Sequence, residues 1–533
     1  MALESSSGHA FYRKVRRRLG LHHLRRSASG ISTYPRINHT WPSSQQDKDH
    51  LRNHTVVVDV EGGLLRSSST FPYFMLVAIE AGSFLRGLVL LCVYLLLCCL
   101  PLPEEAKLKV VVMVCFLGLE KEKVKTVARA TLPKHFLEDV AMEGFEAVRG
   151  VQIVVGVSSV IPRIMLEVFL KDHLGMKAVV GREVKAIEGF YVGLLEKRSE
   201  EFSELAEGSA EKTGFGSSSS YSAHGHHHLF SWCQEVYLVT PEEKGEWSPL
   251  TREQHPRPLI FHDGRLAFRP TPEATLAMFT WFPFAVALTI VRTLIFVSLP
   301  YSASVPIGAM TGVTTRVINS PTSTTGQVKP KHPAPTNPKG HLYVCNHRTL
   351  LDPIYIATML NKKVSAVTYS VSRLSEWLSP IPTFRLTRDR DEDGRRMEQA
   401  LQRGDLVVCP EGTTCREPYL LRFSPLSLEL VDEVYPVALV NLSSMFDGTS
   451  TGRFKWLDSF YYFMNPRPTY HVEFMDKMST RMVINGKKSN SKQVVNMVQG
   501  EIGRVLGFKC TELTRRMKYL MLTGEEGLVD ANQ

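Results

Sequence analysis

The chain of 533 residues is poor in cysteine and contains no Cys-x-x-Cys pair. Its nine cysteines are an odd number, and four of them, Cys92, Cys98, Cys99 and Cys115, lie in strongly apolar runs. Cysteines in such surroundings act as small buried hydrophobic side chains. The pattern therefore excludes a disulfide framework and indicates a reducing compartment. The chain also lacks internal repeats and the basic and aromatic signature of a nucleic-acid module, so we expect no nucleic acid partner.

Acidic residues are scarce near the N-terminus. Residues 11–30 (FYRKVRRRLGLHHLRRSASG) carry seven Lys or Arg and no Asp or Glu. We expect residues 1–50 to form a basic flexible tail, with an Arg- and Ser-rich mitochondrial address as the alternative. Because this region has no apolar core segment, a cleaved secretory signal is not expected. The net charge of +10 favours anionic partners such as membrane headgroups and phosphorylated metabolites.

Two stretches lack charge almost completely. Residues 87–103 (GLVLLCVYLLLCCLPLP) contain no charged residue, and this length is the short limit for crossing a bilayer. A spanning helix, a re-entrant helix and a buried helix all remain open, and membrane insertion is the interpretation that we favour. Residues 274–291 are also apolar. We expect Pro283, Pro300 and Pro306 to break this region into short helices that enter one leaflet or form a hairpin.

The C-terminal third of the chain has the pattern of an α/β domain. It follows a linker at residues 320–340 that is rich in Pro, Thr and Lys. Short apolar strands then alternate with helical segments, which is typical of a partly parallel sheet. The expected elements are strands at 341–346, 405–410 and 434–441 and a helix at 349–360.

The stretch VCNHRTLLDP (344–353) places His347 at the end of a strand and Asp352 five positions later. Five residues turn a regular helix by about 140°. The two side chains can therefore meet only if His347 lies in the turn before a helix and Asp352 reaches back from its first turn. Thr349 is a plausible N-cap for that helix. Such a pair suits a general base, because Asp352 would fix the tautomer of the ring. On spacing alone, a purely structural His–Asp pair remains the alternative.

Two further blocks follow in order. FRLTRDRDEDGRRM (384–397) and CPEGTTCREPYLLRF (409–423) each combine arginines with a turn. Arginine is suited to bidentate phosphate recognition. Either block alone is typical of a solvated charged turn, but the three blocks in this order form a specific pattern. The polar residues that they offer are Arg385, Arg388, Arg390, Glu411, Thr413, Thr414 and Arg416.

The stretch VVVDVEGGLL (56–65) ends an apolar strand in Asp59, and Glu61 follows two residues later. Many phosphate-transfer enzymes place an attacking Asp and an acid/base Asp at this spacing after a strand. Such enzymes also hold Mg²⁺ with further carboxylates. Residues 214–233, where those acids are expected, contain no Asp or Glu, and instead carry Ser and four His. We expect these histidines to lie in a solvated loop.

The blocks NHRTLLDP, FRLTRDR, PEGTTCREPYLLRF and YPVAL resemble the four blocks of glycerolipid acyltransferases. From about residue 54 to 515 the chain is similar to land-plant membrane-bound glycerol-3-phosphate acyltransferases that favour the sn-2 hydroxyl. The resemblance implies an α/β fold with a Rossmann-like N-terminal domain of the haloacid-dehalogenase type, an acyltransferase α/β domain and membrane-associated helices. The expected organisation is a tail (1–50), a phosphatase-like domain (51–260) with a helical insertion near 84–103, membrane helices (261–319), a linker (320–340) and an acyltransferase domain (341–533).

The resemblance also implies roles for single residues. His347 would be the catalytic base and Asp352 its orienting partner. The residues implied in substrate binding are Arg388 and Arg416 for the phosphate, and Glu411, Gly412 and Thr413 for the shape of the acceptor site. Thr414 stands where the family has a basic residue. In the N-terminal domain, Asp59 and Glu61 would belong to a degenerate phosphatase site, because Glu61 replaces an Asp and Gly63 replaces a Thr.

The implied reaction joins acyl-CoA and glycerol 3-phosphate to form lysophosphatidic acid, for glycerolipid or for extracellular polyester (cutin or suberin) synthesis. It needs no metal and no cofactor, since acyl-CoA is a substrate; Mg²⁺ would matter only to an active phosphatase domain. Membrane lipid is an expected partner, at the endoplasmic reticulum or the mitochondrion. The alternatives are a bifunctional enzyme that makes 2-monoacylglycerol and a non-catalytic membrane scaffold. A lysophosphatidic-acid acyltransferase fits the motif TTCREPYLLRF less well.

Overall fold

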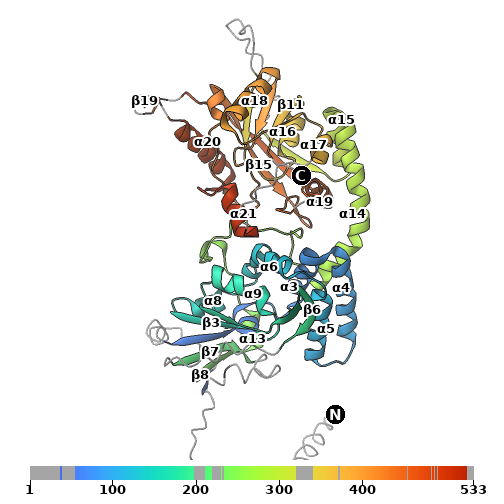
Figure 1. Cartoon of the computed structure of the whole chain (residues 1–533), viewed down its shortest axis with the longest axis vertical. Coiled ribbons are helices and arrows are strands. Elements are labelled where there is room, and N and C mark those ends of the chain that lie inside the picture. Colours follow the sequence, from blue (N-terminus) through green and yellow to red (C-terminus); the bar gives the residue numbers. More distant parts are fainter. Residues whose placement is uncertain are drawn as a thin grey trace, which may run out of the picture.

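The structure of the chain is a computed structural model (Figure 1). It describes residues 36–38, 54–196, 211–218, 230, 233–319, 340–369, 373–452, 454–481, 483–484, 487–488 and 490–524. Most of the predicted tail, nearly all of the predicted linker and the histidine-rich loop lie outside the described residues. The predicted domain boundaries therefore stay predictions at these points.

The N-terminal domain is built on a six-stranded sheet with the order β1-β8-β7-β2-β3-β4, in which every neighbouring pair is parallel. The runs TVVVD and IVVGV supply two central strands, and they are buried almost throughout. Continuous Val-rich runs are typical of parallel strands that are covered on both faces. The strands are β1 (Arg36–Asn38), β2 (Thr55–Asp59), β3 (Ile153–Val157), β4 (Ala178–Val180), β7 (Lys212–Ser217) and β8 (Glu235–Val239).

A helical layer is inserted between β2 and β3 and packs into one large apolar core with the sheet. In Figure 1 its helices α4 and α5 stand beside the sheet on the right. The elements between β2 and β3 are η1 (Val60–Leu64), α3 (Phe71–Val77), η2 (Ala78–Gly82), α4 (Phe84–Cys99), α5 (Glu104–Phe116), α6 (Lys121–Ala130), α7 (Leu132–Leu137) and α8 (Met142–Val148). The helical elements that come later in this domain are α9 (Arg163–Val168), η3 (Phe169–His173), α13 (Pro241–Gly245) and η4 (Arg252–Gln254). A hairpin of β5 (Val184–Ile187) and β6 (Phe190–Leu195) packs on α5.

The C-terminal domain contains a second sheet with the order β12-β11-β13-β10-β15-β16-β9, and β17 pairs with β15. All neighbours in this order are parallel except β15 and β16. The strand β9 comes from the segment that we predicted to be membrane helices. The strands are β9 (Thr314–Ile318), β10 (Leu342–Cys345), β11 (Val364–Thr368), β12 (Thr383–Arg385), β13 (Asp405–Val408), β15 (Glu433–Leu442), β16 (Thr469–Phe474) and β17 (Met478–Ser479).

The order of this sheet determines where the motifs of the predicted acyltransferase blocks meet. Strand β10 lies between β13 and β15, with Val344 opposite Val408 and Cys345 opposite Val437. Because the carboxyl ends of parallel neighbours meet at one edge, the segments after β10 and β13 come together. The remaining elements are α15 (Tyr301–Met310), α16 (Asp352–Leu360), α17 (Arg373–Trp377), α18 (Arg390–Arg403), β14 (Tyr419–Leu420), η5 (Leu428–Leu430), α19 (Leu457–Phe463), β18 (Val483–Ile484), β19 (Lys487–Lys488), α20 (Ser491–Leu506), β20 (Lys509–Cys510) and α21 (Arg515–Thr523).

Helix α14 (Pro272–Ser298) connects the two domains along one side of the molecule (Figure 1). It is the one helix in the described part of the chain that is long and apolar enough to cross a membrane. Our prediction that Pro283 and Pro306 interrupt the helices was wrong, since both lie inside helices. Of the three prolines only Pro300 lies at a break, where Leu299 and Pro300 separate α14 from α15. A proline removes one backbone hydrogen bond. Contacts of Trp281 and Arg292 with the C-terminal domain hold α14 together on both sides of its proline.

Helix α4 is too short to cross a bilayer. Its 16 residues extend about 24 Å at 1.5 Å per residue, whereas the hydrocarbon core is about 30 Å thick. Leu90, Leu91 and Leu97 are buried in the core, and Phe84 packs on Phe282 of α14 with ring centroids 5.1 Å apart. Helix α4 therefore has one face packed on protein, and its length falls short of a straight spanning helix.

Tight packing of α8 on η1 gives a test of the N-terminal fold. A Cβ atom on Gly144 would lie 2.3 Å from the carbonyl oxygen of Gly63. We expect Gly144→Ala to destabilise the protein by about 1–3 kcal/mol, because backbone must move to admit the methyl group. The matched control is Gly500→Ala in α20, where no atom lies within 4 Å of the added carbon. This control should be neutral or stabilising. Thermal unfolding of the two purified variants measures the difference, and equal midpoints would contradict the described packing.

Candidate active site

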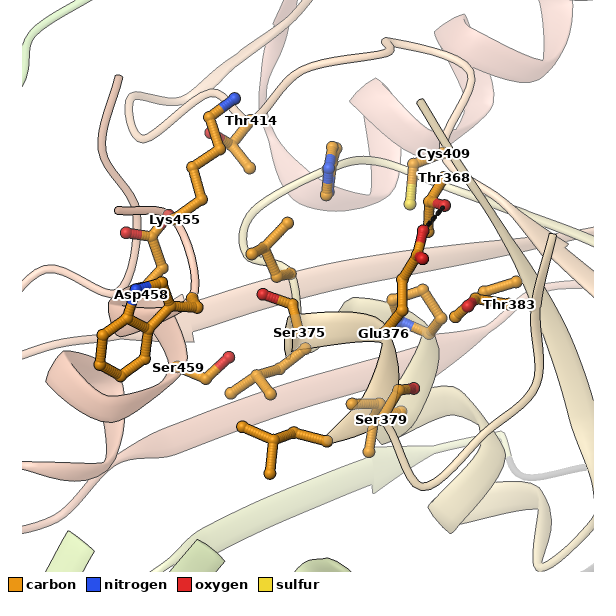
Figure 2. A pocket seen from close by; sticks show the side chains of 18 of the residues that line it. Thr368, Ser375, Glu376, Ser379, Thr383, Cys409, Thr414, Lys455, Asp458 and Ser459 are labelled. Carbon is orange, nitrogen blue, oxygen red and sulfur yellow. Dashed lines mark hydrogen bonds between the residues drawn. The ribbon is translucent and has the colours of Figure 1, made fainter. Parts of the chain in front are cut away.

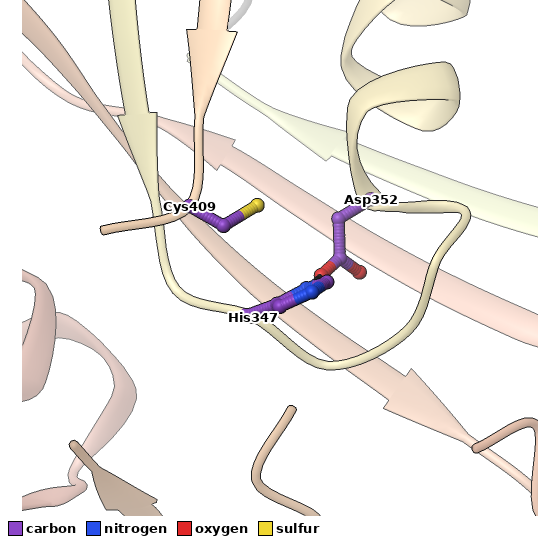
Figure 3. Close-up of side chains that lie close together, drawn as sticks. All are labelled: His347, Asp352 and Cys409. Atoms are coloured by element: carbon purple, nitrogen blue, oxygen red, sulfur yellow. Dashed lines mark hydrogen bonds and ion pairs between the residues drawn. The ribbon is translucent and has the colours of Figure 1, made fainter. Parts of the chain in front are cut away.

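The turn between β10 and α16 brings His347 and Asp352 together (Figure 3). His347 Nδ1 lies 2.8 Å from Asp352 Oδ2, and Asp352 is the first residue of α16. This is the arrangement that their spacing requires, with the histidine before the helix and the carboxylate reaching back. The N-cap prediction was wrong. Thr349 lies in the turn, and Leu351 precedes the helix.

The carboxylate of Asp352 is fully buried and held by several donors. The backbone N–H of Arg348 donates to Oδ2 over 2.6 Å, and that of Thr349 donates over 3.1 Å. The hydroxyl of Tyr470 in β16 donates to Oδ1, and its ring stacks on Tyr355 with centroids 3.9 Å apart. Backbone donors of this kind stabilise a buried carboxylate in its charged form. The imidazole therefore faces a fixed acceptor.

Cys409 completes the immediate surroundings of His347. It comes from the end of the neighbouring strand β13, and its sulfur lies 3.5 Å from that of Cys345. Burial disfavours the imidazolium, but Cys409 and the Asp352 carboxylate outweigh burial and raise the pKa of His347 above its ordinary 6.5. The hydrogen bond with Cys345, together with burial, raises the pKa of the Cys409 thiol well above its usual value.

Glu411 accepts a hydrogen bond that holds the backbone at His347. Its Oε1 accepts the N–H of His347 over 2.7 Å, and its Oε2 accepts the N–H of Leu421 over 2.8 Å. Burial raises the pKa of this carboxyl to about 7. Gly412 follows with φ of 65°, a conformation that favours glycine, and Gly412 and Thr413 both line the cavity described below.

The two predicted phosphate arginines lie in different surroundings. Arg388 is exposed, and its side chain has no hydrogen bond or ion pair with the described residues; its charge reaches Tyr369 in the cavity wall. Arg416 is buried and its guanidinium pairs with Asp263 over 3.2 Å and with Asp447 over 3.1 Å. Neither arginine is among the residues that line the cavity described below, and Arg416 is engaged in an internal ion-pair cluster.

A cavity opens at His347 (Figure 2). With the solvent at its mouth included, its volume is about 1750 Å³. One part of its wall is apolar and includes Phe296 and Val297 from α14. Another part is basic, and its cations are Lys455, Arg515 and Lys518. Sequence reasoning missed these three cations, because they lie outside the recognised blocks, before α19 and on α21, and no local pattern distinguishes them from surface residues.

The predicted phosphatase residues lie at the carboxyl end of β2. Glu61 is buried, and its Oε1 accepts hydrogen bonds from the hydroxyl of Ser158 and, over 3.0 Å, from the N–H of Ile161. Burial and the nearby Asp59 raise the pKa of Glu61. Its side chain therefore holds the turn after β3. Lys244 donates to the Glu61 carbonyl oxygen over 2.6 Å.

The described residues around Asp59 offer no group of three ligand side chains for a Mg²⁺ ion. Throughout the described ranges, the only group of three potential ligand side chains is His347, Asp352 and Cys409, whose ligand atoms lie within 4.8 Å of one another. Asp59 and Glu61 therefore lack a third carboxylate in the described structure. Mg²⁺ requires near-ideal octahedral oxygen ligation. Most of the predicted acid-free loop lies outside the described residues.

Comparison with protein families agrees with this division of the chain. A family described as acyltransferase matches residues 327–440. A second, described as glycerol-3-phosphate acyltransferase RAM2-like, HAD-like domain, matches residues 55–239. The chain is therefore an acyltransferase with an N-terminal haloacid-dehalogenase-like domain.

Individual proteins make the assignment more specific. The chain is 46% identical to probable glycerol-3-phosphate acyltransferase 3 of Arabidopsis thaliana, across 92% of this chain and 94% of that protein. It is 44% identical to glycerol-3-phosphate acyltransferase 1 of the same species, across 90% and 83%. It is 38% identical to glycerol-3-phosphate acyltransferase RAM2 of Petunia hybrida, across 88% and 97%. The chain belongs to the plant glycerol-3-phosphate acyltransferase family.

Two solved structures are similar in part. The lysophosphatidic-acid acyltransferase PlsC of Thermotoga maritima is matched at a TM-score of 0.26 and 12% identity, across 44% of this chain and 95% of that one. A substrate-bound phosphoserine phosphatase is matched at a TM-score of 0.24 and 14% identity, across 36% and 91%. These scores are too low for either structure to support an argument.

The position of Asp352 predicts a pH effect. A histidine base acts only after losing its proton, so the rate rises as the pH passes the pKa of His347. Since that pKa is raised, the acid limb of kcat/KM should lie above pH 6.5. Asp352→Asn removes the carboxylate, and we expect a rate lower by about 10²–10⁴ together with an acid limb at lower pH.

The matched control for this measurement is Asp432→Asn, which removes an exposed carboxylate paired with Arg481. Its profile of kcat/KM against pH should match that of the parent. An acid limb at the same pH in the Asp352 variant and the parent would show that Asp352 does not set the protonation of the base.

Proposed function

We propose that this protein transfers the acyl group of an acyl-CoA to a hydroxyl of glycerol 3-phosphate and forms lysophosphatidic acid. The observation that carries the proposal is the His347–Asp352 pair at a cavity with one apolar and one basic wall. An acyl chain suits the apolar wall, and a phosphate suits the basic wall. The names and coverage of the relatives support the same substrates.

The proposed step uses His347 as the base. Asp352 accepts the proton of Nδ1, so Nε2 is free to take the proton of the acceptor hydroxyl. The hydroxyl oxygen attacks the thioester carbonyl, the carbon–sulfur bond breaks, and the imidazolium returns the proton to the coenzyme A sulfur. A buried thiol with a raised pKa is a weak nucleophile, which favours direct transfer over an acyl-enzyme on Cys409. The step requires no metal.

The remaining site residues receive the roles that the resemblance implies. Arg388 would bind the phosphate, since its exposed guanidinium has no hydrogen bond or ion pair with the described residues. Glu411 fixes the backbone of His347, and Gly412 and Thr413 shape the acceptor site. The phosphate role that the resemblance implies for Arg416 stays a prediction; its two ion pairs fit a brace between the domains.

We further propose that the N-terminal domain is an inactive phosphatase, so the product keeps its phosphate. The engagement of Glu61 with the turn after β3 supports this. The regioselectivity would be sn-2, with a place in glycerolipid or extracellular polyester synthesis. A bifunctional enzyme that releases 2-monoacylglycerol is the alternative that a product analysis tests.

Membrane association is proposed for the apolar side formed by α4, α14 and α15, at the endoplasmic reticulum or the mitochondrion. Phe284, Ile290 and Leu294 of α14 each expose half or more of their surface. The opposite face of α14 is tied to the C-terminal domain, where Trp281 donates to the Met464 carbonyl over 2.8 Å. A helix with one face on protein and the other open suits insertion into one leaflet. Membrane lipid and acyl-CoA would then reach the cavity from the same side.

A product analysis tests the activity. Microsomes that express the chain in a host without its own acyltransferase receive labelled glycerol 3-phosphate and a long-chain acyl-CoA. We expect lysophosphatidic acid with and without chelator, and a rate lower by about 10²–10⁴ in His347→Ala, which has lost the base. His341→Ala, an exposed histidine beside the same strand, is the control. Product formation that is unchanged in His347→Ala would overturn the proposed mechanism.

The same microsomes test the N-terminal domain. We expect Asp59→Asn to leave the products unchanged, and added Mg²⁺ to release no phosphate, because the described residues hold too few carboxylates. Monoacylglycerol that forms only with Mg²⁺ and disappears in Asp59→Asn would establish the bifunctional enzyme instead.

Flotation with phosphatidylcholine vesicles tests the membrane face. We expect Phe284→Asp combined with Ile290→Asp to reduce the vesicle-bound fraction at least tenfold, because each buried Asp costs about 2.5–3.5 kcal/mol at the centre of a bilayer. Met521→Asp on α21 changes an equally exposed apolar residue away from this face and should float like the parent. Flotation of the double variant at the parent level would exclude α14 from the membrane contact.

A further inference from the structure

Three cations gather around one tyrosine in the basic wall of the cavity. Lys455, which precedes α19, donates to the hydroxyl of Tyr519 over 2.9 Å. The guanidinium carbon of Arg515 lies 5.0 Å from the centre of the Tyr519 ring. Lys518 is one helix position before Tyr519 and also lines the cavity. Two segments far apart in sequence thus place their positive charges on the same wall.

Lys518 is buried, and the groups that accept its hydrogen bonds are all neutral. Its ammonium donates to the Thr414 carbonyl over 2.5 Å, to the Thr414 hydroxyl over 3.2 Å and to the Thr413 hydroxyl over 3.5 Å. No ion pair among the described residues involves Lys518 or Lys455. A buried ammonium without a carboxylate is costly unless another anion binds. The wall therefore has an excess of positive charge.

The carboxylates near this wall are each paired with an arginine; Asp263, whose charge reaches Lys518, pairs with Arg416 over 3.2 Å. Glu376 and Asp458 line the cavity, but Glu376 pairs with Arg385 over 2.9 Å and Asp458 pairs with Arg265 over 2.7 Å. The pKa of Tyr519 responds to these positive charges. Burial alone would raise its pKa, yet the adjacent cations lower it below the usual value of 10. Figure 2 shows Glu376 and Lys455 in separate parts of the cavity wall.

We propose that Lys455, Arg515 and Lys518 form an anion subsite that binds a phosphate group of a substrate. The identity of that substrate rests on the proposed acyl transfer, and the phosphate belongs either to glycerol 3-phosphate or to coenzyme A. Lys518 contacts Thr413 and Thr414, which follow Glu411 in the same loop, and Glu411 holds the backbone of His347. A phosphate bound here is therefore held at a defined position relative to the catalytic base.

Equilibrium binding to the full-length protein in detergent tests the subsite. Isothermal titration uses two probes, glycerol 3-phosphate and adenosine 3′,5′-bisphosphate, which carries the 3′-phosphate and one of the two 5′-phosphates of coenzyme A. We expect Lys455→Met and Lys518→Met each to raise the Kd of the same probe at least tenfold, since charge-assisted hydrogen bonds to the phosphate are lost. Lys455→Arg should restore most of the affinity. Lys492→Met on α20 is the control for loss of an exposed lysine.

The probe whose affinity falls identifies the phosphate. Weaker glycerol 3-phosphate binding assigns the subsite to the acceptor, and weaker bisphosphate binding assigns it to the acyl donor. Unchanged Kd values for both probes in Lys455→Met would overturn the subsite; this lysine is half-buried, so its loss should leave the fold intact. If the parent formed no lysophosphatidic acid while Lys455→Met still lost phosphate binding, the proposed reaction would fail and the subsite would stand.

Discussion

The active site depends on one buried charge, the carboxylate of Asp352. A carboxylate without exposure to water is stable only where donors surround it. Backbone N–H groups of Arg348 and Thr349 and the hydroxyl of Tyr470 meet this need, and the last position is taken by His347. The turn must close as it does for these donors to converge, so the same interaction fixes the backbone before α16 and orients the base. This explains why the helix begins at Asp352 itself.

The segment that follows the phosphatase-like sheet contributes to the same site through charged and polar side chains. Arg348 sends its guanidinium to the carbonyls of Cys415 and Glu417, over 2.7 and 2.9 Å. In that segment Arg416 pairs with Asp263, and Glu417 lies 2.9 Å from the buried ring of His262. Asp263 and His262 thus hold the loop at Arg416 and Glu417. The carbonyls of this loop accept hydrogen bonds from Arg348, the residue next to His347. Contacts of this connecting segment therefore help to order the acyltransferase site.

The sequence predicted most of the fold and the pairing of His347 with Asp352, but not the basic wall of the cavity. Alternating strands and helices, and the meeting of His347 with Asp352, follow from local patterns and spacing. Helix α14 was misjudged because proline was weighed only by its lost hydrogen bond, while the contacts that hold the helix come from distant residues. Lys455 and Lys518 were missed for the same reason: each is an ordinary lysine locally, and only the packing of α21 against the cavity gives it a role.

Helix α14 links the proposed membrane-facing surface to the cavity at His347. It exposes Phe284 and Ile290 on one side, whereas Phe296 and Val297 near its C-terminal end line the cavity that contains His347. An acyl chain that leaves the lipid along this helix would stay on apolar surface until it reaches the base. The phosphate group of a substrate would bind at the basic wall, which other elements form. The apolar chain and the phosphate can therefore reach the same histidine along different walls of the cavity.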